Sequence, residues 1–443
     1  MESSISKEAT WGYLLRFALP TIVSMLVMST FGIVDGVFVS RLIDPIALSA
    51  VGIVFPFVSF AMAIGLMLGV GGNALVAKKI GAGMAASGRQ NFSLIALVAF
   101  VLSLVISVLG ITFPDTLLGI LGVDDFVRPM ALEYLTPMMY FMPAIILGMV
   151  LSQFLITVGK AHYIAVMSVV SGIVSASLNY VFIYMLGMGL RGAAIATSIG
   201  FTLPAIVGIV YFTFNRSGDI YFVAPKFELG VIGRASINGS SEMVTMLAVS
   251  VTTVLMNNIL IGLEGPEAVA AASVAFGGVG IFSAFFVGYS AGVIPIISYN
   301  FGAGDKANLR RVYINSLRLI AFLSALAVGL AFLLTDLLIS VFGIPSATPI
   351  YDMAVLGFRF VSIGFVFAGF NTFASMFFTG LNNGLVSAVL SLFRTLVFVV
   401  ICFMILPDIF GLYGAWAAMP VAEVLGVVMT VFFLKVMRVR YGY

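Results

Sequence analysis

The chain has 443 residues, of which 62% are hydrophobic and 9% are charged, and its formal net charge is +3. A soluble fold cannot bury so much apolar side chain, and so small a charge does not indicate a nucleic-acid partner. The apolar runs extend for about 20 residues or more without alternation, which excludes a transmembrane β-barrel. The composition therefore predicts an all-α integral membrane protein.

Twelve long apolar segments follow one another along the chain, and each is long enough to cross a bilayer as a helix. They are expected at about 17–39, 46–76, 91–113, 130–157, 163–186, 193–214, 236–262, 268–298, 314–335, 351–379, 385–406 and 412–435. No connection is long enough for a soluble domain. We expect an N-lobe at 1–214, a cytoplasmic linker at 215–235 and a C-lobe at 236–443.

The basic residues predict the orientation of these segments. Most of the 21 lysine and arginine residues lie in loops on the side of the two termini, which leaves on the other side only Arg41, Arg128, Arg191 and Arg359. Because basic loops stay in the cytoplasm, both termini are expected there. The N-terminus lacks the basic start and the cleavage site of a signal peptide, so the first helix is expected to remain in place.

The two halves of the chain repeat each other. When the chain is shifted by 221 residues, identical residues align at several places along a stretch of more than about 140 residues. The matched pairs include Pro45 with Pro266, Gly81 with Gly302, Arg89 with Arg310, Asp115 with Asp336 and Gly159 with Gly380. Six helices return the chain to its starting side, so the sequence predicts two six-helix lobes related by a pseudo-two-fold axis along the membrane normal.

One carboxylate, Asp35, lies inside the first apolar segment. A charged side chain there costs about 2.5–3.5 kcal/mol, so an intramembrane acid is a candidate functional residue. The alternative is a carboxylate that reaches the headgroups near Arg41. Pro20 in the same segment removes one helix hydrogen bond and predicts a bend.

Three polar residues are expected at the depth of Asp35. Asn179 lies roughly 10 Å from the outer end of the fifth segment, Ser175 is one turn deeper on the same face, and Thr197 is roughly 6 Å into the sixth segment. Together they predict a hydrogen-bonded acid site that carries cations, with Asp35 as a plausible proton carrier. The alternative is that each small polar side chain only packs helices together.

Three further charged residues lie within apolar segments. Glu242 is about seven residues into the seventh segment, where it either contacts a cationic substrate or lies hydrated at headgroup level. Arg394 and Glu423 lie at similar depths in adjacent segments, roughly 14–17 Å from the surface, and are expected to form a structural ion pair. The alternative is that each faces a watery cleft separately.

The chain resembles the multidrug and toxic compound extrusion (MATE) transporters of prokaryotes over essentially its whole length. The resemblance rests on IGAG and FGAG after the second and eighth segments, LRGAAIAT and LYGAWAAMP before the sixth and twelfth, and FALP with VDGVFVSRL in the first. It implies a V-shaped antiporter in the plasma (inner) membrane. Such a protein expels amphipathic, often cationic, compounds in exchange for H⁺ or Na⁺.

The resemblance also implies roles for particular residues. Asp35 and Pro20 match the acid and the proline of the family's first helix, and Thr197 fits its sixth-helix position. Where the family's fifth helix often reads Asn-x-x-x-Asp, this chain has Ser175 and Asn179, so a single acid remains in the cluster. Glu242 loosely resembles the family's helix 7 glutamate. The acid that some members place in helix 10 has no counterpart, which argues against a sodium site in the C-lobe.

The sequence thus predicts a secondary active multidrug exporter that works by alternating access between its lobes. It is expected to be a monomer without a cofactor, and no metal ion is expected except, as an alternative to the proton, Na⁺ near Asp35. One alternative is a lipid-linked oligosaccharide flippase of the same superfamily. Another is a membrane-embedded enzyme, for which the sequence offers no P-loop and no converging set of intramembrane catalytic residues.

Overall fold

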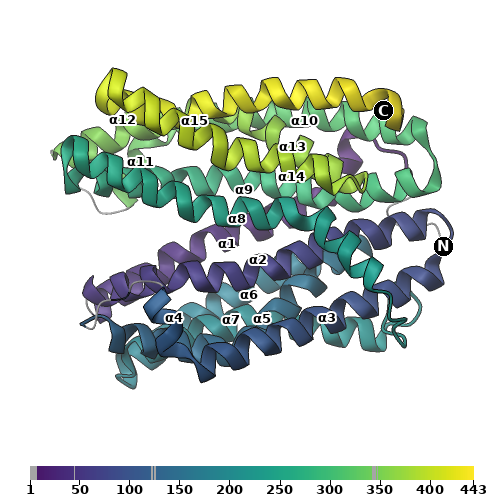
Figure 1. Ribbon diagram of the computed structural model, residues 1–443, viewed down its shortest axis with the longest axis horizontal. Coiled ribbons are helices and arrows are strands. Elements are labelled where there is room, and N and C mark those ends of the chain that lie inside the picture. Colours follow the sequence, from purple (N-terminus) through teal and green to yellow (C-terminus); the bar gives the residue numbers. More distant parts are fainter. Residues whose placement is uncertain (1–6, 44, 121–122, 124–125, 342–345, 347) are drawn as a thin grey trace.

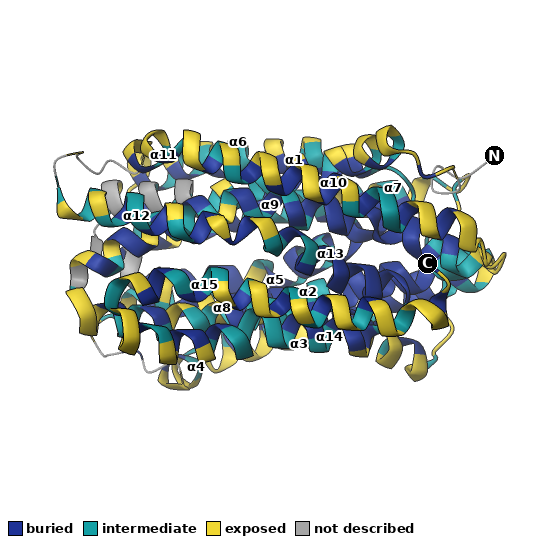
Figure 2. Cartoon of the chain, turned by 90° about the horizontal axis from the view of Figure 1, so that it is seen from above, coloured by how far each residue is buried: buried dark blue, intermediate teal, exposed yellow. Residues whose placement is uncertain are grey.

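Long helices make up nearly all of the computed structural model, which describes residues 7–43, 45–120, 123, 126–341, 346 and 348–443. These ranges contain no β-strand. The helices run side by side along the long axis of the molecule, with both termini at the same end (Figure 1). Buried residues follow the faces where helices meet, and exposed residues cover the outside (Figure 2). The fold is therefore the all-α bundle that the composition predicts.

Each half of the chain contributes a similar series of helices. The first half contains α1 (Trp11–Leu42), α2 (Pro45–Gly81), α3 (Ala85–Thr112), α4 (Pro114–Ile120), α5 (Arg128–Thr157), α6 (Ala161–Asn179), the π-helix η1 (Tyr180–Met185) and α7 (Gly189–Phe214). The second half contains α8 (Leu229–Glu264), α9 (Pro266–Ala303), α10 (Lys306–Leu333), α11 (Thr335–Val341), α12 (Pro349–Ile363), α13 (Phe365–Gly380), α14 (Gly384–Leu392), the π-helix η2 (Phe393–Val397) and α15 (Phe398–Tyr441).

The helix boundaries reproduce the internal repeat. Shifting α3 by 221 residues gives both ends of α10, and the same shift converts the short helix α4 into α11. Neither short helix was expected from the apolar pattern, because each is too brief to cross a membrane. The agreement of these boundaries shows that the two halves share one topology.

Ten helices in the described residues are long and apolar enough to cross a membrane, or eleven if the bent pair α12 and α13 counts as one span. The sequence predicts one segment at 351–379 in place of this pair, and the two helices meet at 50°. The final run, Gly384–Tyr441, has 58 residues. It would be roughly 87 Å long if straight, too long for one crossing. Its backbone leaves helical geometry at Gly411, with φ 57°, and dividing it there would give the expected twelve spans.

Two large hydrophobic clusters form the cores of the molecule. One contains buried side chains between Val39 and Ala235, and the other contains buried side chains between Met256 and Tyr443. The second cluster also includes Leu14 and other residues from the start of α1. The first helix is therefore shared, because its beginning packs on the second core while the rest of the first half forms the other.

The linker between the halves is shorter than the expected 215–235, since α8 already begins at Leu229. It is held along α3 by Arg89, whose Nε donates to the carbonyl oxygen of Asp219 at 3.1 Å and whose guanidinium lies 4.4 Å from the ring centroid of Tyr221. Phe222 packs against Phe92 with a centroid separation of 4.9 Å. The linker therefore packs along α3 of the N-terminal half.

The two halves contact each other through paired glycines near the end that holds the termini. A side chain on Gly81 of α2 would collide with the carbonyl oxygen of Tyr299 in α9, and one on Gly302 would collide with that of Lys78. A shift of 221 residues converts the first contact into the second. The pseudo-two-fold axis therefore passes between α2 and α9, and only glycine permits this close approach of the two backbones.

Candidate cation-coupling site

Asp35 lies in a small polar cluster formed by α1, α6 and α7. Its Oδ1 accepts a hydrogen bond from Nδ2 of Asn179 at 2.8 Å, and its Oδ2 accepts one from Oγ1 of Thr197 at 2.9 Å. Oγ of Ser175 lies 3.5 Å from Oδ1, at the limit of a hydrogen bond. The four residues that share one depth in the sequence are thus brought together in space.

Small residues allow the three helices to meet closely around the carboxylate. The ring of Phe31 on α1 lies against Gly172 on α6, and Gly200 on α7 lies against Ser175. The hydroxyl groups of Ser24 and Ser168 form a further bond between α1 and α6 at 2.5 Å. Close packing of this kind holds the hydrogen-bond donors in fixed positions around Asp35.

The donors around Asp35 are all neutral. Within the described residues no lysine, arginine or histidine forms an ion pair with it, and the side chain of Arg41 lies outside those residues. Desolvation penalises the ionised form of a carboxylic acid, whereas the three donors favour it. The Asp35 carboxyl group therefore has hydrogen-bond donors around it but no fixed counter-charge among the described residues.

Two features beside this cluster were not expected from the sequence. Tyr134 of α5 is buried and close enough to be affected by the charge of Asp35. Asn179 is the last residue of α6 before the π-helix η1, and its Oδ1 is buried without a hydrogen-bond partner in the described chain. A π-helix commonly marks a functional position. Tyr134 lies about 100 residues from Asp35 in the sequence, so no residue pattern predicts that the two lie near each other.

Pro20 lies inside α1, which continues as one helix from Trp11 to Leu42. Gly288 of α9 packs against the backbone of Ile22, and Gly292 packs against Ala18. The part of α1 around Pro20 therefore contacts the second half of the molecule, whereas the part with Asp35 contacts α6 and α7. Pro20 lies in the part of α1 that contacts the second half, before the part that contacts the first half.

The C-lobe contains a second polar cluster, built on an ion pair. Nε of Arg394 lies 4.0 Å from Oε1 of Glu423, and about a fifth of each side chain remains exposed. Nη1 of Arg394 donates to Oγ1 of Thr372 at 2.5 Å, and Nδ2 of Asn371 donates to Oε2 of Glu423 at 2.7 Å. Thr430 completes the cluster by donating to Oδ1 of Asn371 at 2.9 Å. The expected pair is present, at the outer limit of a salt bridge.

Glu242 lies in α8, which begins before the apolar run expected at 236–262. It is about 13 residues, or roughly 20 Å, from the start of the helix at Leu229. The first turns of α8 carry Arg234 and precede the apolar run, so the expected position of Glu242 about seven residues into that run stays a prediction. Arg394 is the opposite charge that acts on Glu242.

The described residues contain no group of three histidine, cysteine, aspartate or glutamate side chains that would hold a metal ion. At the Asp35 cluster, the amide nitrogen of Asn179, and not its oxygen, faces the carboxylate. Na⁺ binds oxygen ligands, so Asn179 would have to turn its amide to contribute one.

The sequence model of the family described as MatE matches residues 20–181 and 243–404. A multidrug export protein MepA of Staphylococcus haemolyticus (strain JCSC1435) is 24% identical over 445 residues, which cover 99% of this chain and 95% of the relative. A MepA of Staphylococcus aureus (strain MRSA252) is 24% identical over 450 residues, which cover 98% of this chain and 95% of that one.

Solved structures share the whole fold. A crystal structure of MATE in complex with MaL6 superposes with a TM-score of 0.92 at 21% identity and covers 98% of both chains. The outward-facing conformation of a multidrug resistance MATE family transporter of the MOP superfamily superposes with a TM-score of 0.90 at 20% identity, again covering 98% of each chain. The two-lobe transporter fold therefore extends over the complete sequence.

Proposed function

The chain belongs to the MatE family. We propose that it exports varied drug-like compounds across its membrane and that proton entry at Asp35 drives this export. The observation that carries this proposal is the Asp35 carboxylate, which three neutral side chains surround and no described cation neutralises. The multidrug export proteins that match it over nearly their whole length support the substrate class. These relatives are transporters, so the chain is not an enzyme.

The transport cycle begins with the change of charge at Asp35. The ionised carboxylate accepts hydrogen bonds from Asn179 and Thr197, whereas the protonated acid can instead donate one. The unpartnered Oδ1 of Asn179 supplies an acceptor for that proton if the amide turns. Protonation therefore rearranges the contacts between α1 and its neighbours α6 and α7.

Pro20 connects this rearrangement to the other lobe. A proline inside a helix removes one backbone hydrogen bond and lets the helix bend at that position. Because α9 holds α1 beside Pro20 through Gly288 and Gly292, a bend there moves the Asp35 segment relative to the C-lobe. Protonation then repacks α1 against α6 and α7, and substrate leaves the N-lobe.

Glu242 is the proposed contact for the cationic group of a substrate. It lies about 20 Å along α8, within the electrostatic range of Arg394, and no hydrogen bond to it is formed within the described residues. An acid at that depth without a close partner attracts a positively charged ligand. The alternation of access between lobes would expose this contact to each side in turn.

One proton is enough for modest accumulation. A charge that crosses 100 mV releases about 2.3 kcal/mol, which supports a roughly 50-fold gradient of a neutral substrate. For a monovalent cation the one-for-one exchange moves no net charge, so the pH difference alone supplies the energy, about 1.4 kcal/mol or tenfold per pH unit. Accumulation of this size does not require a second coupling acid. We further propose a monomer in the plasma membrane of a prokaryote, with both termini in the cytoplasm.

Ethidium efflux from reconstituted vesicles tests this proposal. We expect an imposed pH gradient to drive transport, whereas a Na⁺ gradient at constant pH should not. Transport driven only by Na⁺ would replace the proton by sodium at the same site. The two remaining alternatives fail differently, because a lipid-linked oligosaccharide flippase or an enzyme would move no ethidium under either gradient.

A further inference from the structure

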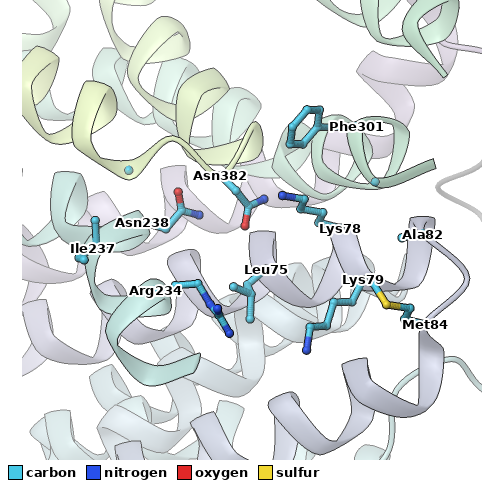
Figure 3. A pocket seen from close by; sticks show the side chains of 12 residues that line it. Leu75, Lys78, Lys79, Ala82, Met84, Arg234, Ile237, Asn238, Phe301 and Asn382 are labelled. Carbon is cyan, nitrogen blue, oxygen red and sulfur yellow. The ribbon is translucent and has the colours of Figure 1, made fainter. Parts of the chain in front are cut away.

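A cavity of about 460 Å³ lies between the two lobes, at the end of the bundle that holds the termini. Its lining includes Lys78 and Lys79 of α2 from one lobe and Arg234 of α8 from the other (Figure 3). Leu75, Met84, Ile237 and Phe301 supply an apolar wall. The cavity thus combines three cations with a hydrophobic surface.

The three cations are not neutralised by acids. Arg234 repels both lysines electrostatically and forms no hydrogen bond or ion pair within the described residues. Lys79 donates to Oγ of Ser87 at 2.7 Å, and Lys78 lies 4.7 Å from the ring centroid of Phe301. Glu228, the acid that acts on Lys79 and Arg234, already pairs with Lys226 at 2.9 Å. Excess positive charge therefore remains at the cavity.

A second observation indicates a ligand with both an anionic group and a hydrogen-bond donor. Asn238 lines the same cavity and is only 3% exposed. Its Nδ2 donates to the carbonyl oxygen of Thr379 at 3.0 Å, but its Oδ1 has no hydrogen-bond partner in the described chain. A buried acceptor of this kind is costly unless a donor reaches it. A phosphate hydroxyl or a glycerol hydroxyl has that property.

We propose that this cavity binds a phosphate-bearing anion, whose charge Lys78, Lys79 and Arg234 neutralise together. The apolar wall and the volume exceed what phosphate alone would fill, which favours the headgroup and glycerol of an anionic phospholipid. Basic pockets between transmembrane helices at the cytoplasmic side recognise such headgroups. A soluble phosphate is the other source of the same chemistry.

The bound anion stabilises contact between the lobes at this end. Lys78 and Lys79 repel Arg234 across the interface, so the empty cavity favours separation of α2 from α8. An anion between them reverses that effect and binds only while the lobes are together. This consequence rests on the proposed alternating access, whereas the binding itself does not.

Binding to the purified full-length protein in phosphatidylcholine nanodiscs tests the site. The probes are short-chain phosphatidylglycerol, short-chain phosphatidylcholine and inorganic phosphate. We expect phosphatidylglycerol to bind, and Lys78→Gln or Arg234→Gln to weaken binding at least about tenfold. Arg234→Lys retains the charge and should retain most of the binding. Arg310→Gln, which removes an exposed charge from α10 outside the cavity, should change nothing.

The outcomes separate the two sources of phosphate. Binding of inorganic phosphate with the same dependence on Lys78 and Arg234 would assign the site to a soluble anion. Binding of phosphatidylglycerol alone would assign it to lipid. Equal binding by the wild-type protein, Lys78→Gln and Arg234→Gln would overturn the site, as would the absence of binding by both anions. Ethidium efflux measured on the same preparations shows separately whether the transport proposal holds.

The effect on the lobes is measured with spin labels at Ala86 and Ala307, which are exposed and equivalent under the 221-residue shift. The background is Cys402→Ser, since Cys402 is the one native cysteine. We expect phosphatidylglycerol nanodiscs to enrich the shorter distance relative to phosphatidylcholine nanodiscs, and Arg234→Gln to abolish that difference. A difference that persists in Arg234→Gln would show that the lipid acts elsewhere.

Discussion

The two lobes treat their intramembrane acids in opposite ways. In the N-lobe, Asp35 is surrounded by the neutral donors of Ser175, Asn179 and Thr197. In the C-lobe, Glu423 faces the fixed positive charge of Arg394 at 4.0 Å. Asp35 thus has no fixed counter-charge among the described residues, whereas Glu423 lies beside a permanently charged guanidinium. We propose that only the acid with neutral neighbours changes its charge during transport.

Each acid, Asp35 and Glu423, has a partner residue beside or within a π-helix. The π-helix η1 directly follows Asn179, and η2 contains Arg394. The π-helix η1 ends the fifth long helix of the first half, whereas η2 lies within the fifth long helix of the second half, and the two are not at equivalent positions under the 221-residue shift. In both halves the fifth long helix therefore carries a polar partner of the acid, Asn179 in one and Arg394 in the other. The two partners differ in charge.

The largest expected effect comes from removing the acid of the N-lobe. Asp35→Asn keeps the shape of the side chain but cannot exchange a proton, so it should fold and bind substrate without coupling. Because exchange of one H⁺ for one ethidium cation moves no net charge, a pH gradient of about one unit should support up to about a tenfold ethidium gradient in the wild-type protein and about onefold in Asp35→Asn. Efflux from vesicles with an imposed pH gradient measures this, with Asp219→Asn in the linker as the control. Undiminished transport would exclude Asp35 and direct attention to Glu242.

A second variant converts the N-lobe site into the C-lobe type. Ser175→Lys places an ammonium beside Asp35, which should hold the carboxylate ionised and abolish pH-driven efflux nearly as completely as Asp35→Asn. Ser175→Met has a similar length without the charge and serves as the matched control. If Ser175→Lys transports as well as Ser175→Met, a neutral environment is not what makes Asp35 a switch.

The ion pair in the C-lobe should matter for stability more than for coupling. Arg394→Leu or Glu423→Leu leaves one charge unpaired in a largely buried position and should cost about 3 kcal/mol of unfolding free energy. The double variant should lose less than the sum of the two, because no isolated charge remains. Thermal unfolding of the four proteins measures the coupling, and additive losses would contradict the pairing.

Glu242 should affect substrate charge selectivity. Glu242→Gln should weaken the binding of cationic substrates by about tenfold, because a charge-assisted contact is lost, and leave the binding of neutral ones nearly unchanged. Binding titrations with ethidium and with a neutral dye of similar size distinguish the two. Glu264→Gln, at the far end of the same helix, is the control. An equal loss for both dyes would indicate a structural role.

The smallest effect is expected at Pro20. Pro20→Ala restores a helix hydrogen bond and stiffens α1, which should slow turnover by roughly two- to fivefold with little change in substrate binding. Initial rates of pH-driven efflux and equilibrium binding of ethidium separate these effects. Pro56→Ala in α2 changes the same residue type in another long helix. Unchanged turnover in Pro20→Ala would show that α1 does not hinge there.

The amino-acid sequence by itself determined the membrane class, the repeat and the depth of the Asp35 cluster. Apolar length and composition are properties of a segment, and the depth of a residue follows from its distance to a helix end. For this reason the sequence alone predicts that Ser175, Asn179 and Thr197 lie at the level of Asp35. The same reasoning placed Arg394 and Glu423 within reach of each other.

Tertiary structure alone decided which faces meet. The burial of Tyr134 near Asp35 and the position of Asn371 beside Glu423 depend on helix rotation. Residue spacing does not determine that rotation in a helix that is apolar on every side. The start of α8 at Leu229 was also decided by the tertiary structure, because a helix can continue past the apolar run into water. The crossing of α1 from one core to the other arises from glycine contacts with α9, which are set by three-dimensional packing.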